Sequence, residues 1–217
     1  MKSIAELYDQ IGENFFDHSS KSPIVACLAR PIVGKKWKEA AAEIFPKQQS
    51  YQNCGLQSSR QIIEQAKMTS LEKSELEFME DAIKSCGAER AEIHPDNSGG
   101  SNARARRCVL KQYGVGSTVE DATVENVKSA LQARQGVIMS ADVEVLWQGR
   151  GVPPQSGRHA VVITHGEYGK DGQMTGVHVN DTGINKRYLL SMSELKDCLA
   201  SGSGQLNVTS ASIWPAD

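Results

Sequence analysis

The sequence predicts an α+β fold in which helices come first and strands second, either as one compact domain or as two lobes that share a cleft. The first observation behind this prediction is apolar spacing typical of helices over much of residues 47–135. The second is a change, from residue 136 onward, to short runs rich in valine and isoleucine with polar turns between them. The third is that Cys54 opens a helix, whereas His159 and Asp181 bracket a predicted hairpin. We therefore expect a twisted antiparallel sheet that faces the helices.

The first 46 residues are predicted to be an N-terminal helical extension of a main domain that spans residues 47–217. Apolar periodicity predicts two amphipathic helices here, over residues 3–13 and 37–45. The extension either packs onto the helical lobe, covers the cleft as a pro-segment or docks a partner. The sequence leaves these three roles open.

A cysteine at the start of a helix is the main candidate for chemistry. Cys54 follows a glutamine-rich loop and precedes apolar residues at helical spacing, with Asn53 as the expected N-cap. Unpaired first-turn N–H groups and the helix dipole favour a thiolate there, which makes Cys54 a potential nucleophile. The side-chain amides of Gln48, Gln49 and Gln52 are donors that can point at an oxyanion beside the sulfur. The alternative is a free cysteine packed beneath a helix.

Three further helices and one turn-rich loop complete the predicted helical lobe. The helices have polar caps or glycine stops at their ends. They are expected after a Thr69–Glu72 cap up to Gly87, over residues 103–113, and over residues 123–135 with Gly136 as the stop. The loop at 94–101 either gates the substrate or is an ordinary surface loop.

The rest of the chain reads as strands. They are expected over residues 137–143, 158–166, 175–181, 187–190 and 205–214, with a short helix capped by Ser191 and Glu194 before the last strand. In an antiparallel hairpin the start of one strand lies beside the end of the next, so His159 can meet Asp181. Alternation puts Asn180 on the other face, so only one of Asn180 and Asp181 can face His159. A thiol nucleophile needs such a base and a third group that fixes its tautomer.

These segments resemble those of papain-like cysteine peptidases. The resemblance rests on Asn-Cys-Gly at 53–55, Gly-Arg-His-Ala-Val-Val at 157–162 and Val-Asn-Asp-Thr-Gly at 179–183. A strand over 136–147 also resembles one that papain-like toxin domains carry before their histidine. The chain is most similar to the bacterial double-glycine (bacteriocin-processing) peptidases and to related toxin and effector domains, over residues 48–199. The resemblance implies the two-lobed papain-like fold, with a helical lobe to about residue 135, a sheet lobe after it and the active site in the cleft between them.

The resemblance also implies a role for each candidate residue. Cys54 matches the nucleophile and His159 the general base. Asp181 matches the orienting acid, with Asn180 as the competing third member because papain itself uses an asparagine. The sequence departs from better-known members at one point, since Asp-Thr-Gly stands where they carry Asp-Pro after the second strand.

The implied reaction is acyl transfer. Gln48 matches the oxyanion-hole glutamine six residues before Cys54, and Gln49 or Gln52 takes this role if the loop carries an insertion. The resemblance favours a cysteine protease that cleaves a protein or peptide through an acyl-enzyme. A glutamine deamidase or a transglutaminase would use the same triad on a side chain of a target protein. The remoter alternative is a catalytically idle protein-binding module that keeps the fold.

The likeness to toxin domains implies a secreted bacterial effector or toxin with a part in virulence. Its expected partners are a protein or peptide substrate and, as further candidates, a secretion-system component, a chaperone or an immunity protein. No signal peptide is evident, and the longest apolar run, over residues 23–33, is too short to span a bilayer. We expect the bacterial cytoplasm before export, then delivery into a host or rival cell without a cleavable signal peptide and without membrane insertion.

Charge and residue spacing point away from other classes of protein. The formal net charge of −2 gives no electrostatic basis for nucleic-acid binding. The basic run Arg104, Arg106 and Arg107 is predicted to be a solvated helix face. The five cysteines and five histidines show no metal-ligand or disulfide-framework spacing, and no cofactor is expected. Three cysteines are expected to be small buried hydrophobes in a reducing interior: Cys86, Cys108 and Cys198.

Overall fold

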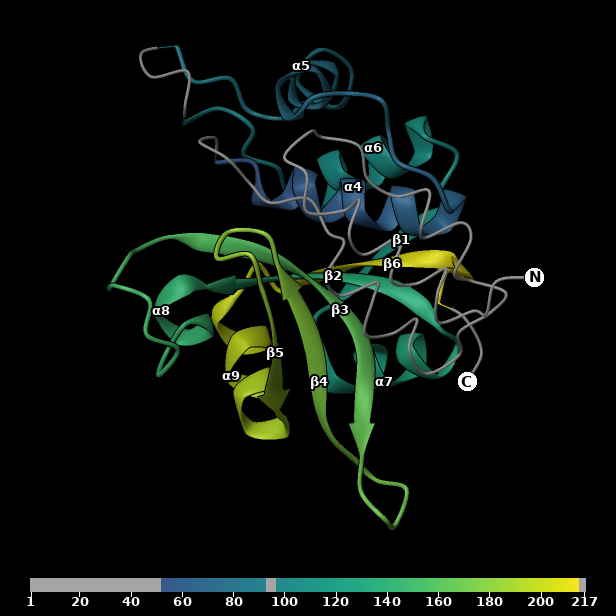
Figure 1. The fold of residues 1–217 in the computed structure, drawn as a ribbon, viewed down its shortest axis with the longest axis vertical. Helices are drawn as coiled ribbons and strands as arrows, with labels where there is room; N and C mark the ends of the chain where they lie inside the picture. The colour runs from purple at the N-terminus through teal and green to yellow at the C-terminus, as the bar shows by residue number, and fades with distance from the viewer. Residues whose placement is uncertain (1–51, 93–96, 215–217) are drawn as a thin grey trace, which may run out of the picture.

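The computed structural model of the chain describes residues 52–92 and 97–214. Its centre is a six-stranded antiparallel sheet with the strand order β1-β6-β2-β3-β4-β5 (Figure 1). The strands are β1 (Ser117–Asp121), β2 (Gln135–Asp142), β3 (Arg158–Tyr168), β4 (Met174–Asp181), β5 (Lys186–Ser191) and β6 (Gln205–Ser212). Helices cover both faces, so the predicted α+β class is confirmed. The short edge strand β1 was not predicted.

Three helices lie over one face of the sheet, two of them against it and the third packed on those two, farther from the strands (Figure 1). They are α4 (Cys54–Lys67), α5 (Glu75–Cys86) and α6 (Ala103–Gln112). Leu56, Ile63, Phe78 and Leu110 of these helices share a buried cluster with Val162 of β3. Each such side chain contributes about 1.5–3 kcal/mol when fully buried. This cluster therefore fixes α4 over the middle of the sheet.

The opposite face is covered by α7 (Val124–Gln132) and α9 (Met192–Ser201). Val127 and Leu195 of these helices pack against Met139, Val161 and Val179 in a second buried cluster. α7 therefore packs on the sheet, away from α4, although the sequence predicts it within the helical lobe. Because both faces of β2 and β3 are covered, these two strands carry consecutive buried residues, most of them apolar.

Local capping decides where α5 begins. The Ser74 hydroxyl accepts a hydrogen bond from the Glu77 N–H, and the Glu77 carboxylate accepts one from the Ser74 N–H. This is a complete capping box. The predicted start at Thr69 and Glu72 is therefore wrong, whereas the predicted stop at Gly87 is confirmed by its left-handed conformation.

Two further boundaries differ from the sequence pattern. α7 ends at Gln132, and Arg134 adopts a φ of 56° that turns the chain into β2. Gly136, the predicted stop, lies inside β2. The strand predicted up to Trp147 is interrupted by the short helix α8 (Val143–Leu146). The capping box predicted for α9 is confirmed.

The cysteines correct another prediction. Cys86 of α5 and Cys108 of α6 form a disulfide, with their Cα atoms 5.4 Å apart. They were expected to be separate buried thiols, because their separation of 22 residues matches no motif and only helix packing brings them together. Cys198 is a buried free thiol, as predicted.

The predicted helices over residues 3–13 and 37–45, and with them the extension over residues 1–46, lie outside the described residues. Within residues 52–92 and 97–214, no helix has the length and apolarity needed to cross a membrane.

Candidate active site

Cys54 is the first residue of α4, and its side chain is half-buried. The carbonyl oxygen of Asn53 accepts hydrogen bonds from the Leu56 and Gln57 N–H groups at 2.8 and 2.9 Å. The first turn of the helix therefore begins at the residue that carries the sulfur. Asn53 occupies the predicted N-cap position, although its side chain makes no capping hydrogen bond. The Ala160 N–H of β3 donates to Cys54 Sγ at 3.3 Å. The sulfur therefore faces the sheet.

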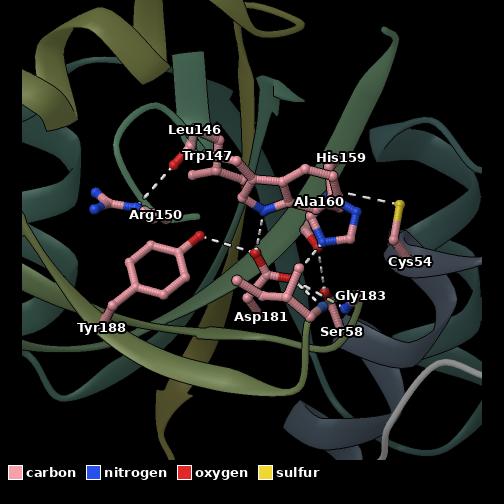
Figure 2. A network of polar contacts seen from close by, with 11 residues as sticks. Cys54, Ser58, Leu146, Trp147, Arg150, His159, Ala160, Asp181, Gly183 and Tyr188 are labelled. Atoms are coloured by element: carbon pink, nitrogen blue, oxygen red, sulfur yellow. Dashed lines mark hydrogen bonds and ion pairs between the residues drawn. The ribbon is translucent and has the colours of Figure 1, made fainter. Parts of the chain in front are cut away.

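The β3–β4 hairpin supplies the other two candidates. His159 is the second residue of β3, Asp181 is the last of β4, and a register that pairs Val162 with Asn180 brings the two together. His159 Nε2 lies 2.7 Å from Asp181 Oδ1, which leaves Nδ1 available to the sulfur. Figure 2 shows the imidazole between the Asp181 carboxylate and Cys54. The predicted meeting of His159 and Asp181 is confirmed.

The Asp181 carboxylate is fully buried and accepts hydrogen bonds at both oxygens (Figure 2). Oδ1 accepts from His159 and from the Gly183 N–H at 2.9 Å. Oδ2 accepts from Trp147 Nε1–H at 2.7 Å and from the Tyr188 hydroxyl at 2.8 Å. Burial raises the pKa of Asp181, but the hydrogen bond and charge of His159, with the two aromatic donors, outweigh it and hold this pKa below its ordinary value. The carboxylate is therefore ionised and fixed in orientation.

Sequence reasoning missed Trp147 and Tyr188. The Trp147 ring lies 5.1 Å from the His159 ring, centroid to centroid, and the Arg150 guanidinium lies 4.4 Å from the centroid of Tyr188. Burial and the charge of Asp181 raise the pKa of Tyr188, which keeps its hydroxyl a donor. Buried tryptophan and tyrosine need a partner for their polar hydrogen. A tryptophan and a tyrosine close to the hairpin in the sequence were therefore the available signal that Asp181 has aromatic hydrogen-bond donors.

The charges of Cys54 and His159 depend on each other. Burial disfavours the thiolate, but the hydrogen bond and charge of His159, the Ala160 N–H and the charge of Arg106 outweigh it, so the pKa of Cys54 lies below its ordinary value. Burial also opposes the imidazolium, yet Asp181 and Cys54 raise the pKa of His159 to about 10. Each of the two groups therefore favours the charged form of the other. A lowered pKa is the property that a cysteine needs in order to act as a nucleophile near neutral pH.

The remaining candidates are placed differently. Asn180 is fully buried, on the opposite side of β4 from Asp181, and its amide atoms have no hydrogen-bond partner among the described residues. Gln48 and Gln49 lie outside the described residues. Gln52 is exposed and donates its amide to Asn97 Oδ1 at 3.2 Å. The glutamine of the oxyanion hole therefore stays a prediction.

A cleft of about 640 Å³ opens over the sulfur and the imidazole. Both layers of the fold contribute to its walls. Its lining includes Gln52, Cys54, Glu89, Gly100, Ser101, Asn102 and Arg106 from the helical side, and Ser140, Val143, Trp147, Arg158, His159, Ala160 and Gly183 from the sheet side. The described part of the loop predicted at 94–101 thus borders the cleft through Gly100 and Ser101.

One lining residue corrects the sequence prediction. Arg106 is only 2% exposed, so it does not belong to a solvated helix face. Arg104 and Arg107, its neighbours on α6, are exposed as predicted. The spacing of three arginines within one helical turn gave no sign that the middle one is buried.

Two other histidines lie farther along the hairpin. The rings of His165 and His178 stack with centroids 4.2 Å apart, and His178 Nε2 lies 2.8 Å from Glu167 Oε2. In the described ranges, no three histidine, cysteine or acidic side chains gather closely enough to hold a metal ion.

Comparison with known proteins gives a structural likeness alone. No protein-family model and no curated protein matches the chain. Among solved structures, it is similar to a Bacillus anthracis protein provisionally described as a C39-like peptidase, with a TM-score of 0.50 and 12% identity, over 77% of this chain and 94% of that chain. The helices and the six-stranded antiparallel sheet therefore form an α+β fold of the C39-like, papain-like type.

Proposed function

We propose that the protein is a cysteine peptidase in which Cys54 is the nucleophile, His159 the general base and acid, and Asp181 the group that orients His159. The observation that carries this proposal is the line from the Cys54 sulfur through the His159 imidazole to the buried Asp181 carboxylate, at the wall of one cleft. The likeness to a protein described as a peptidase agrees with it.

In the first half of the reaction, the Cys54 thiolate attacks the carbonyl carbon of an amide. A carbon–sulfur bond forms, and the carbonyl oxygen takes the negative charge. The Cys54 N–H is a first-turn donor without an intrahelical acceptor and can bind this oxyanion, together with the Gln48 amide predicted from the sequence. The carbon–nitrogen bond then breaks as the His159 imidazolium gives its proton to the leaving amine.

In the second half, neutral His159 takes a proton from water, and the resulting hydroxide attacks the acyl-enzyme. The carbon–sulfur bond breaks, the acid product leaves and the Cys54 thiolate is restored. Asp181 keeps His159 Nε2 as a donor throughout, so that Nδ1 alone exchanges protons at the reacting centre.

The cleft is open along both layers of the fold, which suits a segment of polypeptide as substrate. The role as a bacterial effector or toxin, delivered with the help of a secretion component, chaperone or immunity protein, stays a prediction from the sequence resemblance. The same holds for the deamidase, transglutaminase and idle-module alternatives.

The test is mass spectrometry of a complex protein mixture incubated with the wild type or with Cys54→Ala. New peptide N-termini made by the wild type alone are the expected result, and they also give the cleavage sequence. Deamidated or cross-linked glutamines without new termini would replace the peptidase proposal by one of the alternatives that use the same triad. Identical mixtures from both proteins, with a Cys54 no more reactive than an ordinary thiol, would favour the idle module.

A further inference from the structure

Arg106 is a buried cation at the active-site cleft that the proposed reaction does not use. Its side chain reaches from α6 toward β6, where Nε donates to Asn207 Oδ1 at 2.7 Å. Nη1 donates to the carbonyl oxygen of Ser101 at 2.9 Å. The Asn207 amide is itself fixed by the carbonyl oxygen of Ala103 at 2.8 Å. Neutral acceptors therefore hold the guanidinium rigidly in one place.

The charge of this guanidinium is not balanced by a carboxylate. No ion pair within the described ranges includes Arg106, and its buried Nη2 has no hydrogen-bond partner there. Arginine is almost never fully buried unless it is paired. A buried guanidinium with only neutral partners therefore indicates that a negative group lies nearby during function.

Gly55 lets the guanidinium approach the start of α4. A Cβ atom at Gly55 would lie 3.1 Å from Arg106 Cδ and 3.2 Å from Nη1. Arg106 therefore packs against the residue that follows Cys54. Since the N-terminus of this 14-residue helix already carries partial positive charge, a cation beside it is unfavourable unless an anion shares the site.

We propose that Arg106 is a positioning residue that holds the Cys54 sulfur in its anionic form from the helical side, while His159 does so from the sheet side. This inference rests on the proposed role of Cys54 as nucleophile. His159 loses its charge when it protonates the leaving amine, whereas a guanidinium keeps its charge throughout. Arg106 therefore favours the thiolate both before the attack and when it departs from the acyl-enzyme, whatever the charge of His159 at that step.

The other charged groups near Cys54 do not duplicate this role. Asp181 lies behind His159 and is hydrogen-bonded to it. Glu89 of the helical side and Arg158 of β3 line the same cleft and are exposed, where water screens their charges. The same geometry lowers the pKa of Cys54 mainly through His159, then through the Ala160 N–H, with the charge of Arg106 as a smaller contribution.

The test is the pH dependence of alkylation of Cys54 by iodoacetamide, read at the Cys54 peptide by mass spectrometry. The alkylation rate should rise with pH to a plateau, and the midpoint of this rise gives the pKa of Cys54. Arg106→Gln should raise this midpoint by about one pH unit, which makes alkylation roughly tenfold slower at pH values below the midpoint. Arg106→Lys should restore most of the difference. Arg104→Gln, an exposed arginine on the same helix, is the matched control and should keep the wild-type midpoint.

A second variant keeps the test decisive if Arg106→Gln does not fold. Asn207→Asp places a carboxylate on Arg106 Nε without removing the guanidinium, so it should also raise the Cys54 midpoint. A low wild-type midpoint that neither variant moves would overturn the role of Arg106 alone. A wild-type midpoint near that of an ordinary thiol, about 8.5, would overturn the proposed function and this inference together.

Discussion

The two sides of the candidate site are built differently. On the sheet side, both oxygens of Asp181 accept hydrogen bonds, and His159 lies between that carboxylate and the sulfur. On the helical side, buried polar atoms of Asn53, Gln57 and Arg106 have no hydrogen-bond partner among the described residues. The Asn180 amide of β4 is unpaired in the same way, so the contrast concerns the groups that surround Cys54, His159 and Asp181 and not every buried group of the sheet.

A thiol can be activated by a base held in a fixed orientation or by positive charge near the sulfur, and the two sides of the site correspond to these two ways. The sheet side fixes the position and tautomer of the base through a saturated hydrogen-bond network. The helical side acts on the sulfur through charge, from the α4 N-terminus and from Arg106. Substitutions on the sheet side should therefore change geometry, and those on the helical side should change the thiol pKa.

The largest expected effect on the sheet side comes from Asp181→Asn. The amide keeps the volume but has one acceptor oxygen where Asp181 uses two, so its NH2 group must face either His159 or the Trp147 and Tyr188 donors, and it carries no charge to favour the imidazolium. We expect kcat to fall by about two to four orders of magnitude. Asn180→Ala, one residue away on the other face, should retain activity within about tenfold, because it does not touch His159. Equal losses in the two variants, measured as kcat on a cleaved peptide, would contradict the assignment of Asp181.

Gly183→Ala should have a smaller but still large effect. A Cβ atom there would lie 2.7 Å from His159 Cε1 and 3.1 Å from Nε2, so the imidazole must shift away from Asp181. A displacement of this kind should lower kcat/KM by about a hundredfold with little change in Tm. Gly116→Ala, whose Cβ would meet only Ser210, is the control and should keep full activity. Wild-type kcat/KM in Gly183→Ala would show that the position of the imidazole is not critical.

Removal of one aromatic donor should weaken the sheet side moderately. Tyr188→Phe and Trp147→Phe each take one hydrogen bond from Asp181 Oδ2 and should lower the free energy of unfolding by about 1–3 kcal/mol. The double variant should lose more than the sum, because Oδ2 is then left without either of these donors. Denaturant unfolding of the three variants measures this coupling, and strict additivity would argue against a shared network.

The smallest expected effect is a change in how stability depends on pH, which tests the coupling between Cys54 on the helical side and His159 on the sheet side. Cys54 contributes to the raised pKa of His159, so Cys54→Ala should lower that pKa from about 10. Because the folded pKa exceeds the unfolded value of about 6.5, the stability that charged His159 contributes is complete below that pH and is lost as pH rises toward the folded pKa. In Cys54→Ala this loss should begin at the same pH, since the unfolded pKa is unchanged, and should end at a lower pH. NMR titration of the imidazole gives the pKa, and an unchanged value would show that the two groups are not coupled.

Much of this site follows from local patterns that the sequence displays. Cys54 is predicted at a helix start by a glutamine-rich loop and the apolar spacing after it, and the α4 boundary agrees. The meeting of His159 with Asp181 follows from the antiparallel hairpin, since strand ends are adjacent whatever the rest of the fold. Short-range periodicity therefore suffices to place Cys54, His159 and Asp181 on their elements.

The features that the sequence could not provide depend on contacts between distant elements. Arg106 is buried because Asn207, about a hundred residues later, accepts its hydrogen bond. Cys86 meets Cys108 only because α5 packs on α6. The Trp147 indole donates a hydrogen bond to Asp181 because α8 ends the predicted strand early and directs the chain toward the hairpin. None of these contacts leaves a periodic signal.

The most direct test of the central claim is acylation of the protein by p-nitrophenyl acetate at neutral pH, because this ester needs no knowledge of the natural substrate. Cys198 is an internal control, since burial raises the pKa of its thiol to about 11. We predict a stoichiometric burst of p-nitrophenolate, an acetyl group on Cys54 and none on Cys198, and no burst in Cys54→Ala. A burst that survives in Cys54→Ala, or a Cys54 acetylated no faster than Cys198, would contradict an activated Cys54 nucleophile.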